Sequence, residues 1–357
     1  MIQINDSKKL SKFAPFPLKA FSKIVEIYEV KKGNNVLIWC DTGGKKEFVS
    51  PRLGKTFYKK FLEMGCKVSI IVERKRVRLG SASKKTNEAV LSLGKGDFFV
   101  SFSSGGRGYI VRKGKQVLFK QLIAEQGFKI ACASGLASLS PKAVNSFFES
   151  FDHDAKEINC FSKKLVPILA RTKSVKVSCP LGTNLEMRFG SRGAFSNDGN
   201  WKVYSTNYPL GEVYAAPLEN SVKGVAFVSS AHIIGKTIKP KKPVKFVFHK
   251  GIMLYSDNKE VNFSIARTVA FNKEKIGNYK LAPRTIAEFG IGTNKKAKIL
   301  GVMICDEKTL GSCHFALGNN LSMGGKNDCY GHFDYVIANP TVWADGKKIV
   351  EGGKILL

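Results

Sequence analysis

The first half of this sequence alternates short apolar runs with segments of helical spacing. Continuous apolar runs occupy residues 36–40, 67–73, 97–102 and 128–133. Helical spacing is found in residues 17–30, 50–65, 87–93, 117–125 and from 140 to about 173. An uninterrupted apolar run is typical of a strand buried on both faces, as in a parallel sheet covered by helices. The alternation therefore predicts an α/β N-terminal domain with a mainly parallel sheet.

From about residue 174 the pattern changes to short strand-like segments separated by turns. We expect strands at 175–178, 184–189, 203–207, 213–216, 222–229, 244–249 and 268–271. A segment of helical spacing, 299–306, precedes the strand of His314, and Asp345-Gly346 is typical of a hairpin turn. The chain of 357 residues is long enough for two cores. We therefore predict an α/β domain at 1–173 and a strand-rich α+β domain at 174–357 that carries the functional site.

The net charge of +30 allows two interpretations. A strongly basic protein attracts nucleic acid and anionic membranes through long-range electrostatics. However, only 11 of the 58 basic residues are arginines, and the lysines are dispersed along the chain. The one dense cluster is 73–78, Glu-Arg-Lys-Arg-Val-Arg. We therefore expect a solvated basic surface, with nucleic acid bound only through non-specific charge.

Cysteine usage and the N-terminus indicate a cytoplasmic protein. The eight cysteines include no C-x-x-C pair, and several lie in apolar runs such as 36–40, so we expect buried free thiols. Residues 1–6 lack the basic-then-apolar order of a signal peptide. No apolar run approaches the roughly 20 residues that cross a bilayer. We expect no membrane association.

Three phrases between residues 284 and 336 contain candidate site residues. They are 287–294 (AEFGIGTN), 313–318 (CHFALG) and 331–334 (GHFD). His332 and Asp334 are two residues apart in a strand-like segment, so both side chains project from one face. His314, Glu288 and, further upstream, Glu212 are polar residues in otherwise apolar surroundings, where an unpartnered group is costly. Carboxylates and imidazoles together suggest a shared divalent cation. The same sequence pattern is also expected if these residues are structural and only hydrogen-bonded.

These phrases resemble the aminopeptidase T family of metal-dependent, leucyl-type aminopeptidases. The resemblance covers most of the C-terminal half, including 182–185, 209–224 (PLGEVYAAPLENSVKG), 306–320 (DEKTLGSCHFALGNN) and 324–327. It implies a two-domain metalloaminopeptidase, a hydrolase that removes N-terminal residues from peptides with a free amine. It also implies two divalent ions, among Zn, Co, Mn and Mg, a water activated between them, and a homodimer.

Carried over by position, the resemblance makes Glu212, Glu288, His314, His332 and Asp334 the metal ligands. Glu288 is also the candidate catalytic residue, as a bridging ligand or proton shuttle. Glu219 would orient the ligands, or it caps a turn. The family has a tyrosine ligand seven residues after the first histidine, and Leu321 stands there in this chain.

Two other functions remain open. The departures at Leu321 and Leu210, in Pro209-Leu210-Gly211-Glu212, favour a catalytically altered relative that acts as a peptide-binding scaffold. The high positive charge favours a basic, nucleic-acid-associated protein. Turnover would distinguish the enzyme from the scaffold, and a steep salt dependence would support binding to nucleic acid.

Overall fold

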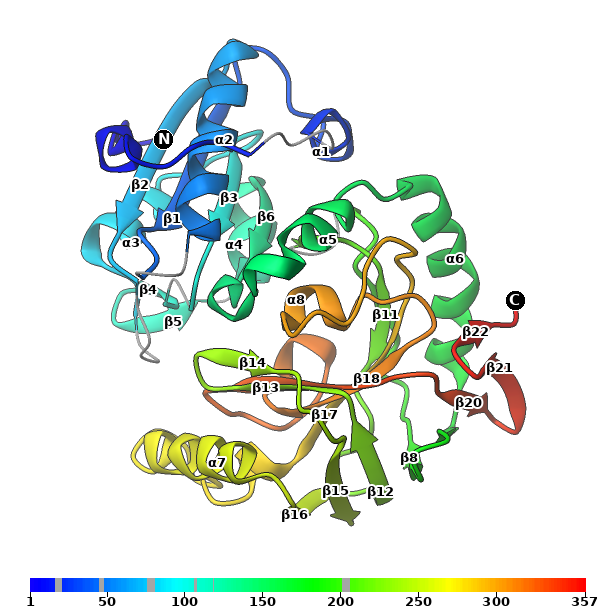
Figure 1. Cartoon of the computed structure of the whole chain (residues 1–357). Helices are drawn as coiled ribbons and strands as arrows, with labels where there is room; N and C mark the ends of the chain where they lie inside the picture. The colour runs from blue at the N-terminus through cyan, green and yellow to red at the C-terminus, as the bar shows by residue number, and fades with distance from the viewer. Residues whose placement is uncertain (17–20, 45–47, 76–80, 106–107, 118, 201–205) are drawn as a thin grey trace. The chain divides into compact units, whose positions relative to one another are not determined.

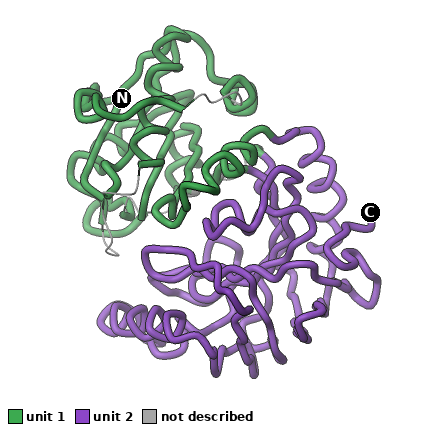
Figure 2. The backbone as a smooth tube through the Cα atoms, viewed as in Figure 1, with its two compact units in different colours: residues 1–152, 199–209 green, residues 153–198, 210–357 purple. Residues whose placement is uncertain are grey.

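The computed structural model describes residues 1–16, 21–44, 48–75, 81–105, 108–117, 119–200 and 206–357. This part of the chain forms two compact units, residues 1–152 with 199–209 and residues 153–198 with 210–357 (Figure 2). The units differ from the predicted ranges 1–173 and 174–357 in two places: residues 199–209 belong to the first unit, and helix α6, Ala155–Arg171, belongs to the second. Its Leu165 and Leu169 are buried in the core of the second unit, which explains why the helix belongs there.

A parallel sheet in the order β10-β6-β3-β1-β2 forms the centre of the first unit (Figure 1). Its strands are β1 (Asn35–Asp41), β2 (Lys67–Glu73), β3 (Phe98–Phe102), β6 (Lys129–Ala133) and β10 (Thr206–Asn207). The accompanying helices are α1 (Phe21–Ile27), α2 (Val49–Glu63), α3 (Lys84–Leu91), α4 (Phe119–Gln126) and α5 (Val144–Glu149). A small hairpin joins β4 (Ile110–Arg112) to β5 (Lys115–Val117).

The first unit follows the predicted alternation. β1 is buried from Val36 to Asp41, because helices cover the sheet as the continuous apolar run indicated. Residues 17–20 of the first predicted helix and 76–78 of the basic cluster lie outside the described residues. None of the eight cysteines, all of which are described, forms a disulfide. Cys160 is exposed, and Cys132 and Cys179 are only partly buried, so the expectation of buried thiols is wrong for these three.

Two antiparallel sheets build the second unit. The seven-stranded sheet has the order β14-β13-β19-β18-β17-β11-β9. Its strands are β9 (Phe195–Ser196), β11 (Glu212–Ala215), β13 (Ser230–Ile233), β14 (Lys236–Ile238), β17 (Ile286–Gly292), β18 (Cys313–Gly318) and β19 (His332–Ile337). The eight-stranded sheet has the order β16-β15-β12-β8-β7-β20-β21-β22. Its strands are β7 (Ser174–Ser178), β8 (Asn184–Arg188), β12 (Lys223–Val228), β15 (Val244–His249), β16 (Ile252–Ser256), β20 (Thr341–Ala344), β21 (Lys347–Glu351) and β22 (Lys354–Ile355).

The apolar faces of these two sheets share one core. Phe246 of β15 contacts Phe315 of β18 and Tyr335 of β19, with ring centroids 5.5 Å and 4.6 Å apart. In each strand, every second side chain points into this shared core and the side chains between them point to the opposite face. The seven-stranded sheet therefore has a second face that does not contribute to the core. The predicted fold class, an α/β domain with a parallel sheet followed by a strand-rich domain, is confirmed.

Two predicted elements of the second unit are wrong. Residues 268–271 are not a strand but the end of helix α7, Lys259–Asn272, whose first turn is capped by Asn258 Oδ1 accepting from the N–H groups of Glu260 and Val261. The predicted helix 299–306 is reduced to α8, Met303–Asp306. Residues 203–205 of a predicted strand lie outside the described residues. None of the described helices is long and apolar enough to cross a membrane.

Candidate metal centre

The candidate site lies on the face of the seven-stranded sheet that is turned away from the shared core. In β18 and β19 the side chains of Phe315 and Tyr335 point into the core. The alternate positions are His314 in β18, and His332 and Asp334 in β19. The alternation of side chains with a period of two residues, visible in the sequence, therefore places the apolar side chains on one face of each strand and the candidate ligands on the other.

The strand register brings the candidate residues into neighbouring rows. Ala316 of β18 is paired with Asp334 on one side and with Glu288 of β17 on the other. His314 is paired with Gly290. The small residues leave room: a Cβ on Gly290 would lie 2.3 Å from Cε1 and Nε2 of the His314 ring. Glycine at this position lets the imidazole lie over β17.

Glu288, His332 and Asp334 form the first of two overlapping groups. His332 Nε2 lies 3.3 Å from Glu288 Oε2 and 3.3 Å from Asp334 Oδ1. The ligand atoms of all three residues fall within 4.8 Å of one another. His332 Nδ1 lies 2.7 Å from the carbonyl oxygen of Asn319, which can only accept, so Nδ1 carries a proton. Unless Nε2 is also protonated, its lone pair faces two carboxylates, an arrangement that requires a cation between them.

Glu212, Glu288 and His314 form the second group. His314 Nε2 lies 3.1 Å from Glu288 Oε1 and 3.5 Å from Glu212 Oε2. His314 is buried, and its Nδ1 has no hydrogen-bond partner among the described residues. Glu288 thus presents one carboxylate oxygen to each group.

The buried charges shift the pKa values of these residues. Burial would lower the pKa of His314, but the hydrogen bond with Glu288 and the carboxylate of Glu212 raise it to about 9. Burial also opposes protonation of His332, yet Asp334 and Glu288 raise its pKa well above the ordinary value. For Asp334, burial alone would raise the pKa, and the charge and hydrogen bond of His332 lower it. The positive charges of the two protonated imidazoles then balance the negative charges of the carboxylates.

Lys308 is a site residue that sequence analysis missed. It is fully buried, and its ammonium forms ion pairs with Glu212 Oε1 and, at 2.5 Å, with Glu307 Oε1. Burial raises the pKa of Glu307 to about 8 despite the adjacent ammonium. No sequence signal distinguished this lysine, because the triplet Asp306-Glu307-Lys308 reads as a solvated turn.

His232 of β13 was also missed. Continuing the β13–β19 register, in which Ala231 pairs with Tyr335, places His232 beside Asp334. Its ring contacts Phe333 edge-on, with centroids 5.4 Å apart. In the part of the chain that the structure describes, its buried Nδ1 has no hydrogen-bond partner. A histidine in the strand-like run 230–234 was a usable signal, because a polar ring in an apolar run is costly to bury without a partner.

Glu219 lies beside the site rather than in it. Its carboxylate forms a bidentate ion pair with Arg192, at 2.9 Å and 2.7 Å, and accepts hydrogen bonds from Asn320 Nδ2 and the Lys326 N–H. Arg192 and the loop bonds lower the pKa of Glu219 to about 2, although burial alone would raise it. Asn320 follows Asn319, whose carbonyl accepts from His332. Glu219 therefore fixes the loop that orients His332.

Leu321 offers no ligand to either group. It lies in a 3-10 turn after β18, and its side chain is 43% exposed. The ring of Tyr330 contacts Phe271, with centroids 5.9 Å apart. Leu321 therefore does not take the place of the tyrosine ligand that the aminopeptidase resemblance implied.

These observations define a class: a two-unit protein whose antiparallel sheet carries a buried cluster of carboxylates and imidazoles suited to a divalent cation. Residues 156–357, more than half of the chain, match the family model NicX, described as 2,5-dihydroxypyridine 5,6-dioxygenase. The chain belongs to this family.

Two solved structures share the fold. The 2,5-dihydroxypyridine dioxygenase of Pseudomonas putida KT2440 matches with a TM-score of 0.68 and 15% identity, over 95% of this chain and 96% of that one. Wild-type AmpT from Thermus thermophilus matches with a TM-score of 0.60 and 16% identity, over 95% and 99% of the two chains. No curated protein sequence matches the chain.

The assignment to the aminopeptidase T family is therefore wrong, and with it the functional terms hydrolase, aminopeptidase, metalloprotease and proteolysis. The family model that matches the site-bearing half is that of a dioxygenase. The motifs at Glu212, Glu288 and His314 describe a fold and a cluster of side chains, and one such arrangement supports different reactions on related scaffolds. The match supports an enzyme, of the oxygenase class rather than a peptidase.

Proposed function

We propose that this chain is a metal-dependent dioxygenase that opens the ring of a dihydroxylated nitrogen heterocycle. The observation that carries the proposal is that the family match, 156–357, includes every residue of the candidate centre, from Glu212 to Asp334. The 2,5-dihydroxypyridine of the family's description is the first substrate to test. A dioxygenase transfers both atoms of O₂ to the product, so the ring opens without an external reductant.

One divalent ion would be held by Glu288 Oε2, His332 Nε2 and Asp334. His332 suits this role because its Nδ1 proton is donated to Asn319, which leaves Nε2 as the coordinating atom. Mixed imidazole and carboxylate donors with open positions are typical of non-haem iron oxygenases. When bound, a redox-active ion such as Fe(II) would bring O₂ and the dihydroxylated ring together and carry electrons between them. Among the ions first expected, Zn and Mg cannot do so.

Lys308 favours one ion over the two that were predicted. Its ammonium already supplies a positive charge to Glu212 and Glu307 inside the protein. A second cation beside Glu212 would have to displace that ammonium or share its carboxylate with it, and like charges at this distance repel strongly.

Glu288 and His314 would handle the substrate proton. A hydroxyl group on the ring loses its proton more easily near a cation, and that proton needs an acceptor. Glu288 Oε2 faces His332, whereas Oε1 is hydrogen-bonded to His314 Nε2. One oxygen of the carboxylate is therefore assigned to the ion. Nε2 of a neutral His314 would accept the substrate proton, and the other carboxylate oxygen, Oε1, would hold that proton in a hydrogen bond.

The test is anaerobic loading of metal-free protein with Fe(II), followed by addition of 2,5-dihydroxypyridine and O₂. We expect loss of the ring absorbance, one O₂ consumed per ring, and both atoms of ¹⁸O₂ in the product. Asp334→Asn should abolish turnover and weaken metal binding, whereas Asp328→Asn, an exposed carboxylate near the same loop, should do neither. Metal-loaded protein that consumes no O₂ with any dihydroxypyridine would refute the proposal.

The homodimer and the cytoplasmic location stay predictions. Mass measurement in solution tests the first, and fractionation of cells that produce the protein tests the second. The peptide substrates that the earlier resemblance implied are replaced by the heterocycle.

A further inference from the structure

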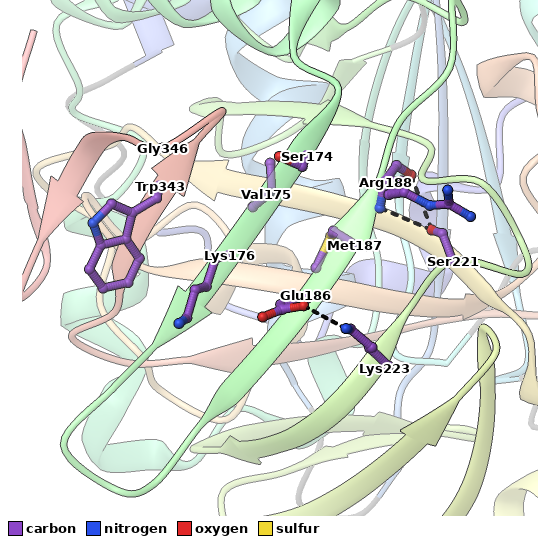
Figure 3. Close-up of a pocket in the computed structure, with 10 residues that line it drawn as sticks. All are labelled: Ser174, Val175, Lys176, Glu186, Met187, Arg188, Ser221, Lys223, Trp343 and Gly346. Atoms are coloured by element: carbon purple, nitrogen blue, oxygen red, sulfur yellow. Dashed lines mark hydrogen bonds and ion pairs between the residues drawn. The ribbon is translucent and has the colours of Figure 1, made fainter.

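We infer that the outer face of the eight-stranded sheet binds single-stranded nucleic acid, at a cavity of about 890 Å³ (Figure 3). The cavity lies over β7, β8, β12 and β20. On these strands Val175, Val177 and Leu185 point into the core that the two sheets share. The alternate residues Ser174, Lys176, Glu186 and Arg188 line the cavity together with Val175 and Met187. The side chains of these alternate residues face away from the metal centre and serve none of its chemistry.

A row of side chains crosses the sheet at this cavity. Trp343 of β20 is paired with Lys176 of β7, Lys176 with Glu186 of β8, and Glu186 with Lys223 of β12. Neighbouring strands are about 4.8 Å apart, so an aromatic ring, two lysines and one carboxylate stand side by side. Figure 3 shows Glu186 and Lys223 joined by their ion pair, while Trp343 and Lys176 stand clear of it.

The charge of the cavity is positive after internal pairing. Glu186 is neutralised by Lys223, with Nζ 2.9 Å from Oε2. Among the described residues, the exposed side chains of Lys176 and Arg188 form no ion pair. The pKa of Glu186 is lowered chiefly by its hydrogen bond with Lys223 and to a smaller extent by the charge of Lys176. Two unpaired cations in a chain of net charge +30 attract a polyanion. The same charge disfavours a second copy of this chain as the occupant, because two basic faces repel.

Trp343 adds a reason for nucleic acid over an acidic protein. Its indole has no ring, cation or hydrogen-bonding partner among the described residues, and it stands at the edge of the cavity (Figure 3). Bases of a single strand stack on such rings while cations beside them hold the phosphates. An acidic peptide would use Lys176 and Arg188 but would leave the indole unused.

The test is fluorescence anisotropy of a labelled 15-mer of thymidine with the full chain, over a series of salt concentrations. Lys176→Gln/Arg188→Gln should weaken binding and lower the slope of log affinity against log salt by about 1.4, since each phosphate contact in a single strand contributes about 0.7. Lys163→Gln/Lys273→Gln removes two exposed cations of the same unit elsewhere and should leave the slope unchanged. An equal loss in this control pair would overturn the site.

The indole is tested separately. Trp343→Ala should weaken binding of the 15-mer by about 5- to 150-fold, the range of one lost stacking contact, and Trp343→Phe should restore most of it. An abasic 15-mer should bind to Trp343→Ala and to Trp343→Phe with equal affinity. If Trp343→Ala changes nothing, or if a poly-glutamate of the same charge competes as well as the 15-mer, the face does not recognise nucleic acid. Thermal unfolding should be unchanged in all variants, because the substituted side chains are not buried.

Discussion

Adding one methyl group at Gly290 should disrupt the candidate centre through a defined clash. The ideal Cβ would lie 2.3 Å from both Cε1 and Nε2 of His314 and 3.1 Å from its Nδ1. Carbon and nitrogen atoms that are not bonded prefer separations of about 3.5 Å or more, so the ring must move by roughly an ångström. The ring is buried beside Glu212 and Glu288 and has little space to move.

We expect Gly290→Ala to reduce the free energy of unfolding by about 1–3 kcal/mol, the usual cost of overpacking. Displacing His314 also breaks its hydrogen bond to Glu288, so oxygenase turnover should fall further than stability does. Urea unfolding measures the first effect, and O₂ consumption by the Fe(II)-loaded protein measures the second. Gly277→Ala is the matched control, because a Cβ there has no atom within 4 Å.

A double-mutant cycle identifies the clashing partner. In a His314→Ala background the ring is absent, so adding Gly290→Ala should cost less than about 0.5 kcal/mol. The reasoning would be refuted if Gly290→Ala cost the same in both backgrounds, since the strain would then come from the backbone of β17 rather than from the imidazole.

Three further predictions concern charges around the centre. Lys308→Met should destabilise the protein by about 3–5 kcal/mol, because it leaves the buried carboxylate of Glu212 without its cation. Added divalent metal should restore part of this stability with a second ion bound, as thermal unfolding and metal analysis would show. A stoichiometry that stays at one would contradict the role given to the ammonium. The pKa of Glu219 is lowered from 4.5 to about 2, so its contribution to stability is complete above pH 4.5 and is lost as the pH falls toward 2. The stability of the wild-type protein should therefore fall more steeply in this window than that of Glu219→Gln, by up to about 3 kcal/mol. Parallel curves for the two proteins would exclude this contribution of Glu219. Arg192→Met should loosen the loop of Asn319 and Asn320. A metal titration should then show binding weakened by about 10- to 100-fold, the usual effect of removing a residue that supports a metal ligand. Unchanged metal affinity would contradict this role of Arg192.

One part of the candidate site could be predicted from a local rule, whereas the convergence of all five candidate residues was implied by the family resemblance. His332 and Asp334 share a face through the period of two. A local rule also predicted the parallel sheet of the first unit from its apolar runs. Whether these residues bind metal stays a prediction that the experiments above address.

Other features depend on contacts that no local pattern contains. Thr268, Val269 and Phe271 favour a strand by composition, but the cap at Asn258 and the packing of Val261 and Ile265 determine a helix. Lys308 is buried only because Glu212, 96 residues earlier, pairs with it. The class of reaction was missed for a different reason: carboxylate and imidazole donors are common to hydrolytic and oxidative centres.

The candidate ligands lie on β11, β17, β18 and β19, which are adjacent in the middle of one sheet. A ligand on a loop can swing away while the rest of a protein stays folded, but none of these four strands can leave without separating the sheet from its shared core. Release of a bound ion would therefore have to wait for side-chain motion alone or for global unfolding. A chelator should strip such an ion slowly, at a rate that rises with denaturant as steeply as unfolding itself.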